Sequence, residues 1–402
     1  MKTIAIIGTL DTKGMECEFL RDVLKGLGLK TLMIHAGVFD GTVPADVSNA
    51  EVARAAGYDI REVVAKKDRA HGTEVMSQGM RAILPRLYEE GKFDGAISLG
   101  GSGGSALATA GMRQLPIGVP KLVISTMAGG DVSPYVGSSD IIMYPSIVDA
   151  AGLNEITRTV FANGAHAIAG MVNYATERET SGKPLVAASM FGVTTPCVDR
   201  ARAVMEENGY EVITFHATGT GGKAMEKLIA GGYFKGVLDL SPTEWCDELF
   251  GGVLNAGPRR MEAAAQNGVP QVVSVGALDM VNFGPRDTVP ERYKGRNLYQ
   301  HNPTVTLMRT TVEENKKLGE VIAEKLNMAV GPTVLLLPLK GVSMIDAEGQ
   351  GFYGPEEDAM LFAALRQNIK NPHVRIVEMD NHINDPAFAE AAANALLDLL
   401  KA

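Results

Sequence analysis

Short apolar runs alternate with amphipathic segments along the first half of the chain. The runs predict buried strands at residues 3–7, 30–35, 95–99, 121–125 and 140–144. Apolar positions at helical spacing predict helices between them, at residues 15–25, 73–89 and 105–112. Strands that are apolar along their whole length are typical of parallel sheets covered by helices on both faces. The pattern therefore predicts a doubly wound α/β unit.

The same alternation starts again in the second half. Strands are predicted at residues 185–190, 211–216, 236–240, 271–275, 305–309 and 333–337. Helices are predicted at residues 197–208, 223–229, 312–327 and 385–400, and residues 276–304 are the most irregular segment. Between the halves, a helical pattern over residues 153–174 leads into a polar stretch, residues 176–184, which is typical of a domain boundary. We therefore predict two Rossmann-like domains with mainly parallel sheets, residues 1–180 and residues 184–402.

Composition narrows the class of protein. The 402 residues are 46% hydrophobic and 21% charged, with 45 glycines, which indicates a globular chain with two cores. A net charge of −9 disfavours nucleic acid and anionic membranes as partners. Cys17, Cys197 and Cys246 form no Cys-x-x-Cys motif, so neither a disulfide framework nor a zinc ribbon is expected. Because the N-terminal apolar run is too short for a signal peptide, we expect a cytoplasmic protein with reduced thiols.

A glycine-rich turn between the strand at residues 95–99 and the following helix carries the clearest chemical signal. Backbone without Cβ atoms can bend its N–H groups around an anion, and a helix N-terminus adds about half a positive charge. Turns of this kind at the carboxyl edge of a parallel sheet bind phosphate-bearing ligands. The predicted ligand residues are Gly101, Ser102, Gly103, Gly104 and Ser105.

The same turn also fits the Gly-x-Ser-x-Gly elbow of α/β-hydrolases, with Ser102 as nucleophile. That chemistry needs a later acid, Asp131 or Asp140, and then a histidine. His166 follows in the right order but lies within a predicted helix. We therefore favour a phosphate cradle, and keep a serine hydrolase and a merely tight turn as alternatives.

Two further loops in the first half follow predicted strands. The loop after the first strand offers hydroxyls and an ammonium group that could bind phosphate, and a carboxylate that could bind a ribose hydroxyl or a nucleotide-bound Mg²⁺. These residues are Thr9, Asp11, Thr12 and Lys13. The loop does not contain the P-loop motif. The loop after the fourth strand is built of small residues that leave room for a flat or phosphorylated ligand, namely Thr126, Met127, Ala128, Gly129 and Gly130. The alternatives are a helix N-cap and a surface loop.

The second half holds another glycine-rich helix start, which predicts a second anion site. Its residues are Thr218, Gly219, Thr220, Gly221, Gly222 and Lys223. His216 at the strand end, Lys223 and His382 are candidate catalytic groups, and Asn384 is a candidate ligand group. The alternative for the turn is an ordinary N-cap. One or two of the acidic residues from Glu244 to Glu248 could face the cleft, and the alternative is a solvated acidic helix start. Because no His pair or Cys/His cluster occurs, no built-in metal site is expected.

Several motifs occur together in a fixed order: GTLDTKG at 8–14, LGGSGGS at 99–105, MFGVTTP at 190–196, HATGTGG at 216–222 and HINDP at 382–386. With them the chain resembles the Tm-one-like ATP-binding domain family, an uncharacterised protein family related to the N-terminal region of the tomato mosaic virus resistance protein. The resemblance implies two Rossmann-like subdomains, ATP bound in the first, and a homodimer. By position, it assigns the nucleotide to residues 9–13, 101–105 and 126–130.

Three functions follow as hypotheses. The first is an ATP-dependent phosphotransferase or ligase that acts on a small anionic metabolite at a cleft between the domains. The second is a nucleotide-binding or scaffolding dimer without turnover. The third is a serine hydrolase that uses Ser102.

Overall fold

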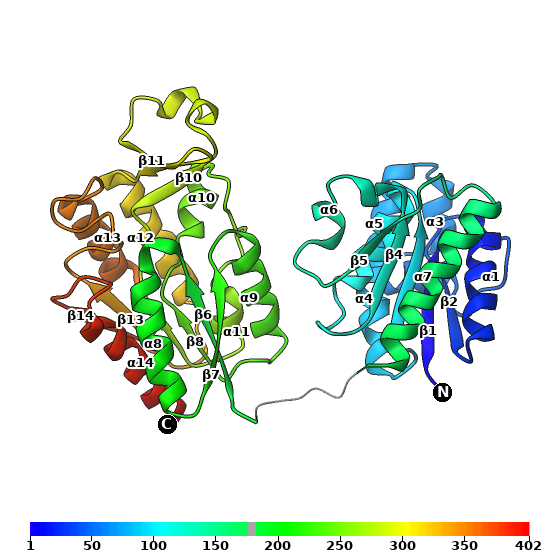
Figure 1. The fold of residues 1–402 in the computed structure, drawn as a ribbon, viewed down its shortest axis with the longest axis horizontal. Helices are drawn as coiled ribbons and strands as arrows, with labels where there is room; N and C mark the ends of the chain where they lie inside the picture. Colours follow the sequence, from blue (N-terminus) through cyan, green and yellow to red (C-terminus); the bar gives the residue numbers. More distant parts are fainter. Residues whose placement is uncertain (176–181, 402) are drawn as a thin grey trace. The chain divides into compact units, whose positions relative to one another are not determined.

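The computed structural model describes residues 1–175 and 182–401 and divides the chain into two compact units, Met1–Glu179 and Thr180–Ala402 (Figure 1). Each unit has its own sheet and its own buried core. The predicted domain boundary falls partly on residues 176–181, outside the described residues. In the described part of the chain, no helix combines the length and the apolar character needed to cross a membrane.

The first unit is built on a five-stranded parallel sheet in the order β2-β1-β3-β4-β5. The strands are β1 Thr3–Gly8, β2 Lys30–His35, β3 Gly95–Gly100, β4 Lys121–Ser125 and β5 Ile142–Pro145. In register, Ile4 of β1 lies opposite Thr31 on one side and Gly95 on the other. The predicted parallel sheet of the first half is therefore confirmed.

Helices cover both faces of this sheet (Figure 1). They are α1 Leu10–Gly26, α2 Asn49–Ala55, α3 Ile60–Ala65, α4 Arg69–Glu89, α5 Ser102–Met112, α6 Ser133–Val136 and α7 Glu155–Asn173. Alternate side chains of β1 point to opposite faces: Ile4 and Ile6 pack with α1 and α7, and Ala5 and Ile7 pack with α4 and α5. This double burial explains why the strands are apolar along their whole length.

The strand order reverses between β1 and β3. From β1 the chain crosses to β2 on one side, and it then returns past β1 to β3 on the other side. The loops that follow β1 and β3 therefore diverge at the carboxyl edge of the sheet. Open α/β sheets bind ligands at such a reversal.

The second unit repeats this plan with a six-stranded parallel sheet in the order β14-β13-β9-β8-β6-β7. Its strands are β6 Leu185–Met190, β7 Glu211–His216, β8 Gly236–Asp239, β9 Gln271–Val273, β13 Thr333–Pro338 and β14 Val374–Met379. One face is covered by α8 Thr195–Glu207 and α14 Pro386–Lys401. The other face is covered by α9 Thr220–Ala230, α10 Glu244–Phe250, α11 Glu262–Gln266, α12 Val312–Leu326 and α13 Pro355–Asn368. Here the reversal lies between β6 and β8.

A small antiparallel sheet in the second unit was not predicted as such. It consists of β10 Met280–Phe283, β12 Val305–Arg309 and β11 Leu298–Asn302, in that order. The sequence predicts β12 but assigns its two partners to the irregular segment 276–304. β11 is almost entirely exposed, so it lacks the apolar signal of a strand. Helix α13 and strand β14 were also missed.

Two glycines in helices of the first unit test this packing. A Cβ at Gly79 of α4 would lie 2.1 Å from the Val52 carbonyl oxygen of α2, whereas a Cβ at Gly170 of α7 would meet no atom within 4 Å. We expect Gly79→Ala to lower the free energy of unfolding by about 1–3 kcal/mol through overpacking. Gly170→Ala should raise it by about 0.5–1 kcal/mol, because alanine restricts the unfolded chain. Urea denaturation followed by circular dichroism measures both, and equal stabilisation by the two variants would contradict the α2–α4 contact.

Candidate functional site

A pocket of about 730 Å³ opens at the carboxyl edge of the first sheet, where the strand order reverses. Four segments line it: the loop after β1, the loop after β2, the turn between α3 and α4, and the loop between β3 and α5. Its volume lies in the range of small-molecule sites. The loops at residues 9–13 and 100–104 are far apart in the sequence, and in the structure they line the same pocket.

The glycine-rich turn forms the N-terminus of α5, which no side chain caps. The N–H groups of Ser102, Gly103 and Gly104 lie in the pocket wall without an intrahelical partner, at the positive end of the helix dipole. A Cβ on Gly103 would meet no atom within 4 Å, and one on Gly101 would only touch the Thr126 hydroxyl at 3.7 Å. The fold itself therefore does not require glycine at either position.

Ser105, the last residue of the predicted cradle, is fully buried. Its Oγ lies 2.7 Å from Ser125 Oγ, which also accepts the Met127 N–H at 3.0 Å. These bonds tie the start of α5 to the short helical turn Thr126–Gly129. The predicted loop of residues 126–130 therefore borders the glycine turn but does not line the pocket.

The loop after β1 supplies hydroxyls and a cation. Thr9 Oγ1 and Thr12 Oγ1 lie 2.9 Å apart at the surface of the pocket. The helix geometry of α1 breaks at Lys13, whose ammonium group donates a hydrogen bond to the Ala150 carbonyl. Lys13 lines the pocket, so its ammonium group is placed to bind an anion there.

Asp11 is the only carboxylate among the predicted ligand residues, and only one of its two oxygens has a hydrogen-bond partner in the described residues. Its Oδ2 accepts the Phe39 N–H at 3.2 Å. Its Oδ1 is buried and has no hydrogen-bond partner in the described residues. A Cβ on Gly37 would lie 2.4 Å from this oxygen, so glycine there leaves room for the carboxylate. A buried oxygen without a partner is costly unless a ligand supplies a donor or a cation.

The loop after β2 was missed by the sequence analysis, and His35 fixes its shape. The buried ring accepts the N–H groups of Leu10 and Gly37 at Nδ1, at 3.2 and 3.1 Å. Its Nε2 lies 2.7 Å from the Phe39 carbonyl oxygen. Two donors at Nδ1 require the neutral ring with its proton on Nε2. His35 therefore holds the loops after β1 and β2 together.

Further pocket residues come from α3, from the start of α4 and from the turn between them. The helix at residues 73–89 was predicted, but none of these residues was predicted to line a site. Apolar side chains form one part of the wall: Val38, Phe39, Val63, Val64 and Leu107. Two cations, Lys67 and Arg69, stand at the turn before α4. A basic run at residues 66–69 was the only sequence signal for them, and no strand precedes it.

The residues of a serine triad do not gather around Ser102. Asp140 forms an ion pair with the buried Lys121 at 2.8 Å, and Asp131 accepts the N–H of the nearby Ser133. His166 is exposed on α7, which covers the face of the sheet opposite to α5. In the described parts of the chain, no hydrogen bond activates Ser102.

In the second unit, the side chain of Glu244 binds the glycine-rich helix start at residues 218–223, where the sequence predicted an anion site. Glu244, 1% exposed, accepts the N–H groups of Gly219 and Gly222 with Oε1, at 2.6 and 3.0 Å. A Cβ on Gly221 would lie 1.8 Å from the His216 carbonyl oxygen, so packing alone requires glycine there. These two N–H groups of the helix start already have an anion, and Glu244 is not part of a solvated helix start.

Glu244 belongs to a buried network centred on Arg260, which is 1% exposed. The guanidinium binds Glu244 Oε2 at 2.7 Å, both oxygens of Asp239 at 2.6 and 2.7 Å, and Glu226 Oε1 at 3.2 Å. Ser189 Oγ donates to Asp239 as well. Burial raises the pKa of Glu226 above its usual value. The network fixes the loops after β6, β7 and β8 from within, which is a structural role.

The candidate catalytic groups of the second unit are not brought together. His216 and Lys223 are exposed beside β7, whereas His382 follows β14. β7 and β14 are the two edge strands of the sheet, and in the described residues no hydrogen bond joins His382 to His216 or Lys223. His382 Nε2 contacts the Ser343 carbonyl at 2.8 Å, and Asn384 bonds the Val193 carbonyl at 3.0 Å.

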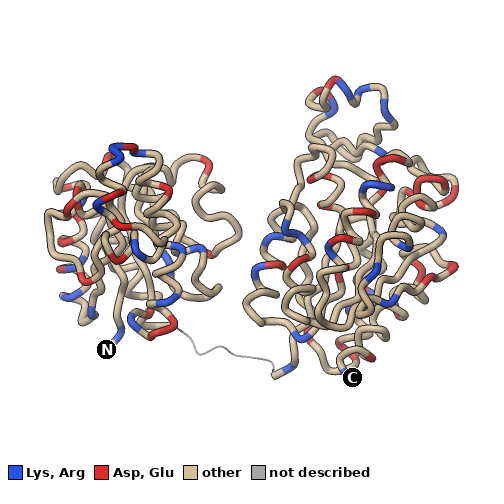
Figure 2. Tube along the Cα trace, turned by 180° about the vertical axis from the view of Figure 1, so that it is seen from behind, with Lys and Arg blue, Asp and Glu red and all other residues tan. Residues whose placement is uncertain are grey.

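The thiols and charges of the described residues add no second centre. All three cysteines are free and buried, and burial raises the pKa of Cys17 and Cys197 to about 12. No group of three or more His, Cys, Asp or Glu side chains in residues 1–175 and 182–401 is placed to hold a metal ion. Figure 2 shows basic and acidic residues interspersed over both units.

Comparison with known proteins confirms the resemblance found in the motifs. Models of the N-terminal and C-terminal domains of uncharacterised protein family UPF0261 match residues 2–177 and 183–400. A UPF0261 protein of Clostridium tetani is 53% identical over 401 residues, 100% of this chain and 99% of that protein. The ToMV resistance protein Tm-1(GCR237) of Solanum lycopersicum is 40% identical over 98% of this chain and 55% of its own length. The solved UDP-N-acetylglucosamine 2-epimerase from Rickettsia bellii is 12% identical over 68% of this chain and 78% of its own, with a TM-score of 0.23.

Adjacent arginines test the buried network. Arg260→Met leaves three buried carboxylates without their cation, and we expect it to lower the free energy of unfolding by about 3–5 kcal/mol. Arg259→Met, whose side chain is 85% exposed, should change it by less than about 0.5 kcal/mol. Denaturant unfolding of both variants checks this, and equal stability of the two would show that the network does not hold the second unit together.

Proposed function

This chain belongs to the uncharacterised protein family UPF0261, and we propose that its first unit binds ATP, with Mg²⁺, in the pocket at the carboxyl edge of its sheet. The family resemblance implies ATP, and the chemistry of the pocket supports a phosphate-bearing ligand. Nothing in the proposal depends on how the two units are placed.

Gly103, in the first turn of α5, carries the proposal. Glycine within a helix, as at Gly103, lowers its stability by about 0.5–1 kcal/mol relative to alanine, whereas glycine at the N-cap, the position of Gly101, is preferred over alanine. Neither Gly101 nor Gly103 has a positive φ, and neither is needed by the packing around it. A ligand that approaches the backbone closely would explain Gly103, because a Cβ there would then meet the ligand. The uncapped N–H groups beside it are suited to a phosphate.

The rest of the pocket suits the other parts of a nucleotide. The apolar wall, which includes Val38, Phe39 and Val63, offers a surface for a base. The unpartnered Oδ1 of Asp11 would accept a ribose hydroxyl or hold the nucleotide-bound Mg²⁺. Lys67 and Arg69 would neutralise phosphate charge.

We propose an ATP-dependent phosphotransferase or ligase acting on a small anionic metabolite as the reaction class. Such enzymes work mainly by positioning and charge neutralisation, for which the cations of the pocket suffice. A nucleotide-regulated homodimer without turnover is the second candidate. The observation that favours it is that the lining residues among those described include no histidine or cysteine, so the carboxylates of Asp11 and Asp68 would have to serve as the base. Product formation from ATP, Mg²⁺ and candidate acids by the purified protein separates the two.

Gly103→Ala tests the cradle. Saturation with a hundredfold excess of ATP–Mg²⁺ over Kd should stabilise the native protein by about 2.7 kcal/mol. We expect the variant to bind at least about tenfold more weakly, which lowers this gain to about 1.4 kcal/mol or less at the same concentration. Its stability without ligand should not fall, because its Cβ meets no protein atom.

Thermal unfolding with ATP–Mg²⁺, NAD and free phosphate measures these effects. Gly170→Ala is the matched control, because it makes the same change in a helix away from the pocket. An unchanged ATP effect in Gly103→Ala would contradict the assignment of the turn. If no nucleotide stabilises the wild-type protein, labelling of Ser102 by a fluorophosphonate becomes the next test.

Asp11→Asn tests which part of the ligand this side chain meets. The amide keeps an acceptor for the Phe39 N–H but removes the charged oxygen that has no partner. Loss of a hydrogen bond to a charged group costs about 1.5–3 kcal/mol, so ATP–Mg²⁺ should bind at least about tenfold more weakly. Metal-free tripolyphosphate should bind equally well or better, because a negative charge has been removed. Calorimetric titration gives both affinities, and equal losses for the two ligands would place Asp11 at the phosphates instead.

A further inference from the structure

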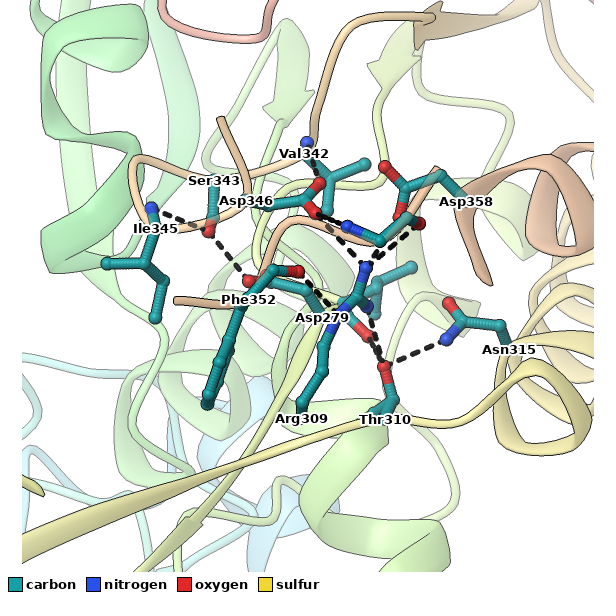
Figure 3. Close-up of polar contacts among 12 residues, drawn as sticks. Asp279, Arg309, Thr310, Asn315, Val342, Ser343, Ile345, Asp346, Phe352 and Asp358 are labelled. Carbon is teal, nitrogen blue, oxygen red and sulfur yellow. Dashed lines mark hydrogen bonds and ion pairs between the residues drawn. The ribbon is translucent and has the colours of Figure 1, made fainter. Parts of the chain in front are cut away.

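Four ionisable side chains meet in the core of the second unit (Figure 3). Arg309 ends β12, Asp279 precedes β10, Asp346 lies between β13 and α13, and Asp358 belongs to the first turn of α13. The Nη2 atom of Arg309 lies 3.1 Å from Asp346 Oδ1 and 3.1 Å from Asp358 Oδ1. Asp279 and Asp346 are completely buried. No part of the proposed ATP site is involved.

This cluster holds the segment between β13 and α13, residues 339–354, which we call the 339–354 loop. Asp346 accepts the N–H of Val342 near the start of the loop, at 2.8 Å, and the N–H of Gly354 at its end, at 3.2 Å. Arg309 donates from Nε to the Phe352 carbonyl at 2.8 Å and from Nη2 to the Gly354 carbonyl. The Asp346 carboxyl group therefore binds both ends of the loop, and the Arg309 guanidinium binds its C-terminal end.

The cluster has more acids than bases. Three ionised carboxylates beside one guanidinium would leave two negative charges in the protein interior, which is strongly unfavourable. Asp346 Oδ1 and Asp358 Oδ1 lie 3.1 Å from the same Arg309 Nη2 atom, so the two carboxyl groups are neighbours, and a proton held between them would remove their mutual repulsion. Asp279 Oδ2 accepts the Ser343 hydroxyl at 2.7 Å, but its Oδ1 has no partner in the described residues. Three buried carboxyl groups around one guanidinium therefore favour at least one bound proton.

We propose that the 339–354 loop is a proton-linked latch: the proton shared by Asp346 and Asp358 keeps it closed, and opening of the loop releases that proton to solvent. The loop supplies much of the wall of a second pocket, of about 850 Å³, through Lys340, Ala347, Glu348 and Tyr353. Asp358 itself lines this pocket. The latch therefore links the shape of this pocket to pH.

The direction of the linkage follows from burial. Burial, with the neighbouring Asp358, raises the pKa of Asp346 to about 8, and burial raises the pKa of Asp358 as well. Burial and the nearby Asp346 raise the pKa of Asp279 to about 7. In the open loop a carboxyl group titrates near its usual pKa of about 4. The closed form therefore binds more protons between about pH 4 and about pH 8, so closure weakens as the pH rises through this window.

Other titratable groups face the cluster and must be considered. Cys246 and Glu314 lie on the side of Asp279, and Glu357 lies close to Gly354. His382 Nε2 contacts the Ser343 carbonyl at 2.8 Å. A pH effect on the loop by itself does not identify the shared proton, so the test needs a variant that removes only this proton.

Asp358→Asn is that variant. An asparagine oxygen can still accept from Arg309, and its amide can donate permanently to Asp346 in place of the shared proton. Asp346 keeps its bonds to Val342 and Gly354. Asp398→Asn, an exposed acid of α14 in the same unit, is the matched control.

Hydrogen exchange of the Val342, Phe352 and Gly354 amides, divided by the intrinsic rate at each pH, measures opening of the latch. In the wild-type protein, protection should fall about tenfold per pH unit for each proton released, between about pH 5 and about pH 8, and level off above. Asp358→Asn should have a slope lower by about one proton, and Asp398→Asn should have the wild-type slope. Constant wild-type protection across this range, or an equal slope in Asp358→Asn, would overturn the proposal. Should Asp358→Asn fail to fold, constant wild-type protection across this range would still overturn the proposal.

Discussion

In both units, the reversal of strand order next to the first strand of a parallel sheet decides which loops diverge at its carboxyl edge. The chain leaves β1 toward one edge and passes back to β3, and it repeats this at β6 and β8. Because all strands of each sheet are parallel, the loops after them meet at one edge, and at the reversal they diverge. Residues separated by about ninety positions, such as Asp11 and Gly103, come to line one pocket for this reason alone.

The two units share an architecture but differ in what contacts the glycine-rich helix start at the carboxyl edge of the sheet. Each has a glycine-rich helix start at this edge, with N–H groups that need an anion. In the second unit Glu244 supplies the anion internally, and Arg260 balances its charge. In the first unit α5 has no such cap, and its N–H groups remain in the wall of a pocket. Two units of similar fold therefore differ in whether the N–H groups of the equivalent helix start face a pocket or a protein carboxylate.

Buried charge is balanced differently around the two central arginines of the second unit. Both Arg260 and Arg309 are almost inaccessible, and each faces three carboxylates. Around Arg260 the acids also accept backbone N–H groups, from Met261 and Ala263 among others, which spreads the negative charge over many donors. Around Arg309, Asp346 also accepts two backbone N–H groups. Two of the acids there share one guanidinium nitrogen, however, and Asp279 Oδ1 has no partner in the described residues, which favours bound protons in place of cations. The first arrangement therefore balances its charge through hydrogen bonds, and the second is the one for which we propose a dependence on pH.

The sequence by itself determined the parallel sheets and the position of the main loop. Strands buried on both faces must be apolar throughout, so β1, β3 and β4 are visible in the chain. The glycines from 100 to 104 could be identified because no regular element contains so many. By contrast, β11 is exposed and α2 and α3 are short, and such elements leave little apolar periodicity.

Only the tertiary structure decided which loops are free to bind. In the sequence, the turns at residues 101–105 and 218–223 look equivalent, because both are glycine-rich starts of helices after a strand. Their difference lies in a partner 25 positions away, Glu244, whose burial beside Gly219 no local pattern reveals. The apolar wall at Val63 and Val64 and the unpartnered oxygen of Asp11 likewise arise from packing between distant segments. Local composition fixes backbone geometry, whereas hydrogen-bond satisfaction and burial are settled by the chain as a whole.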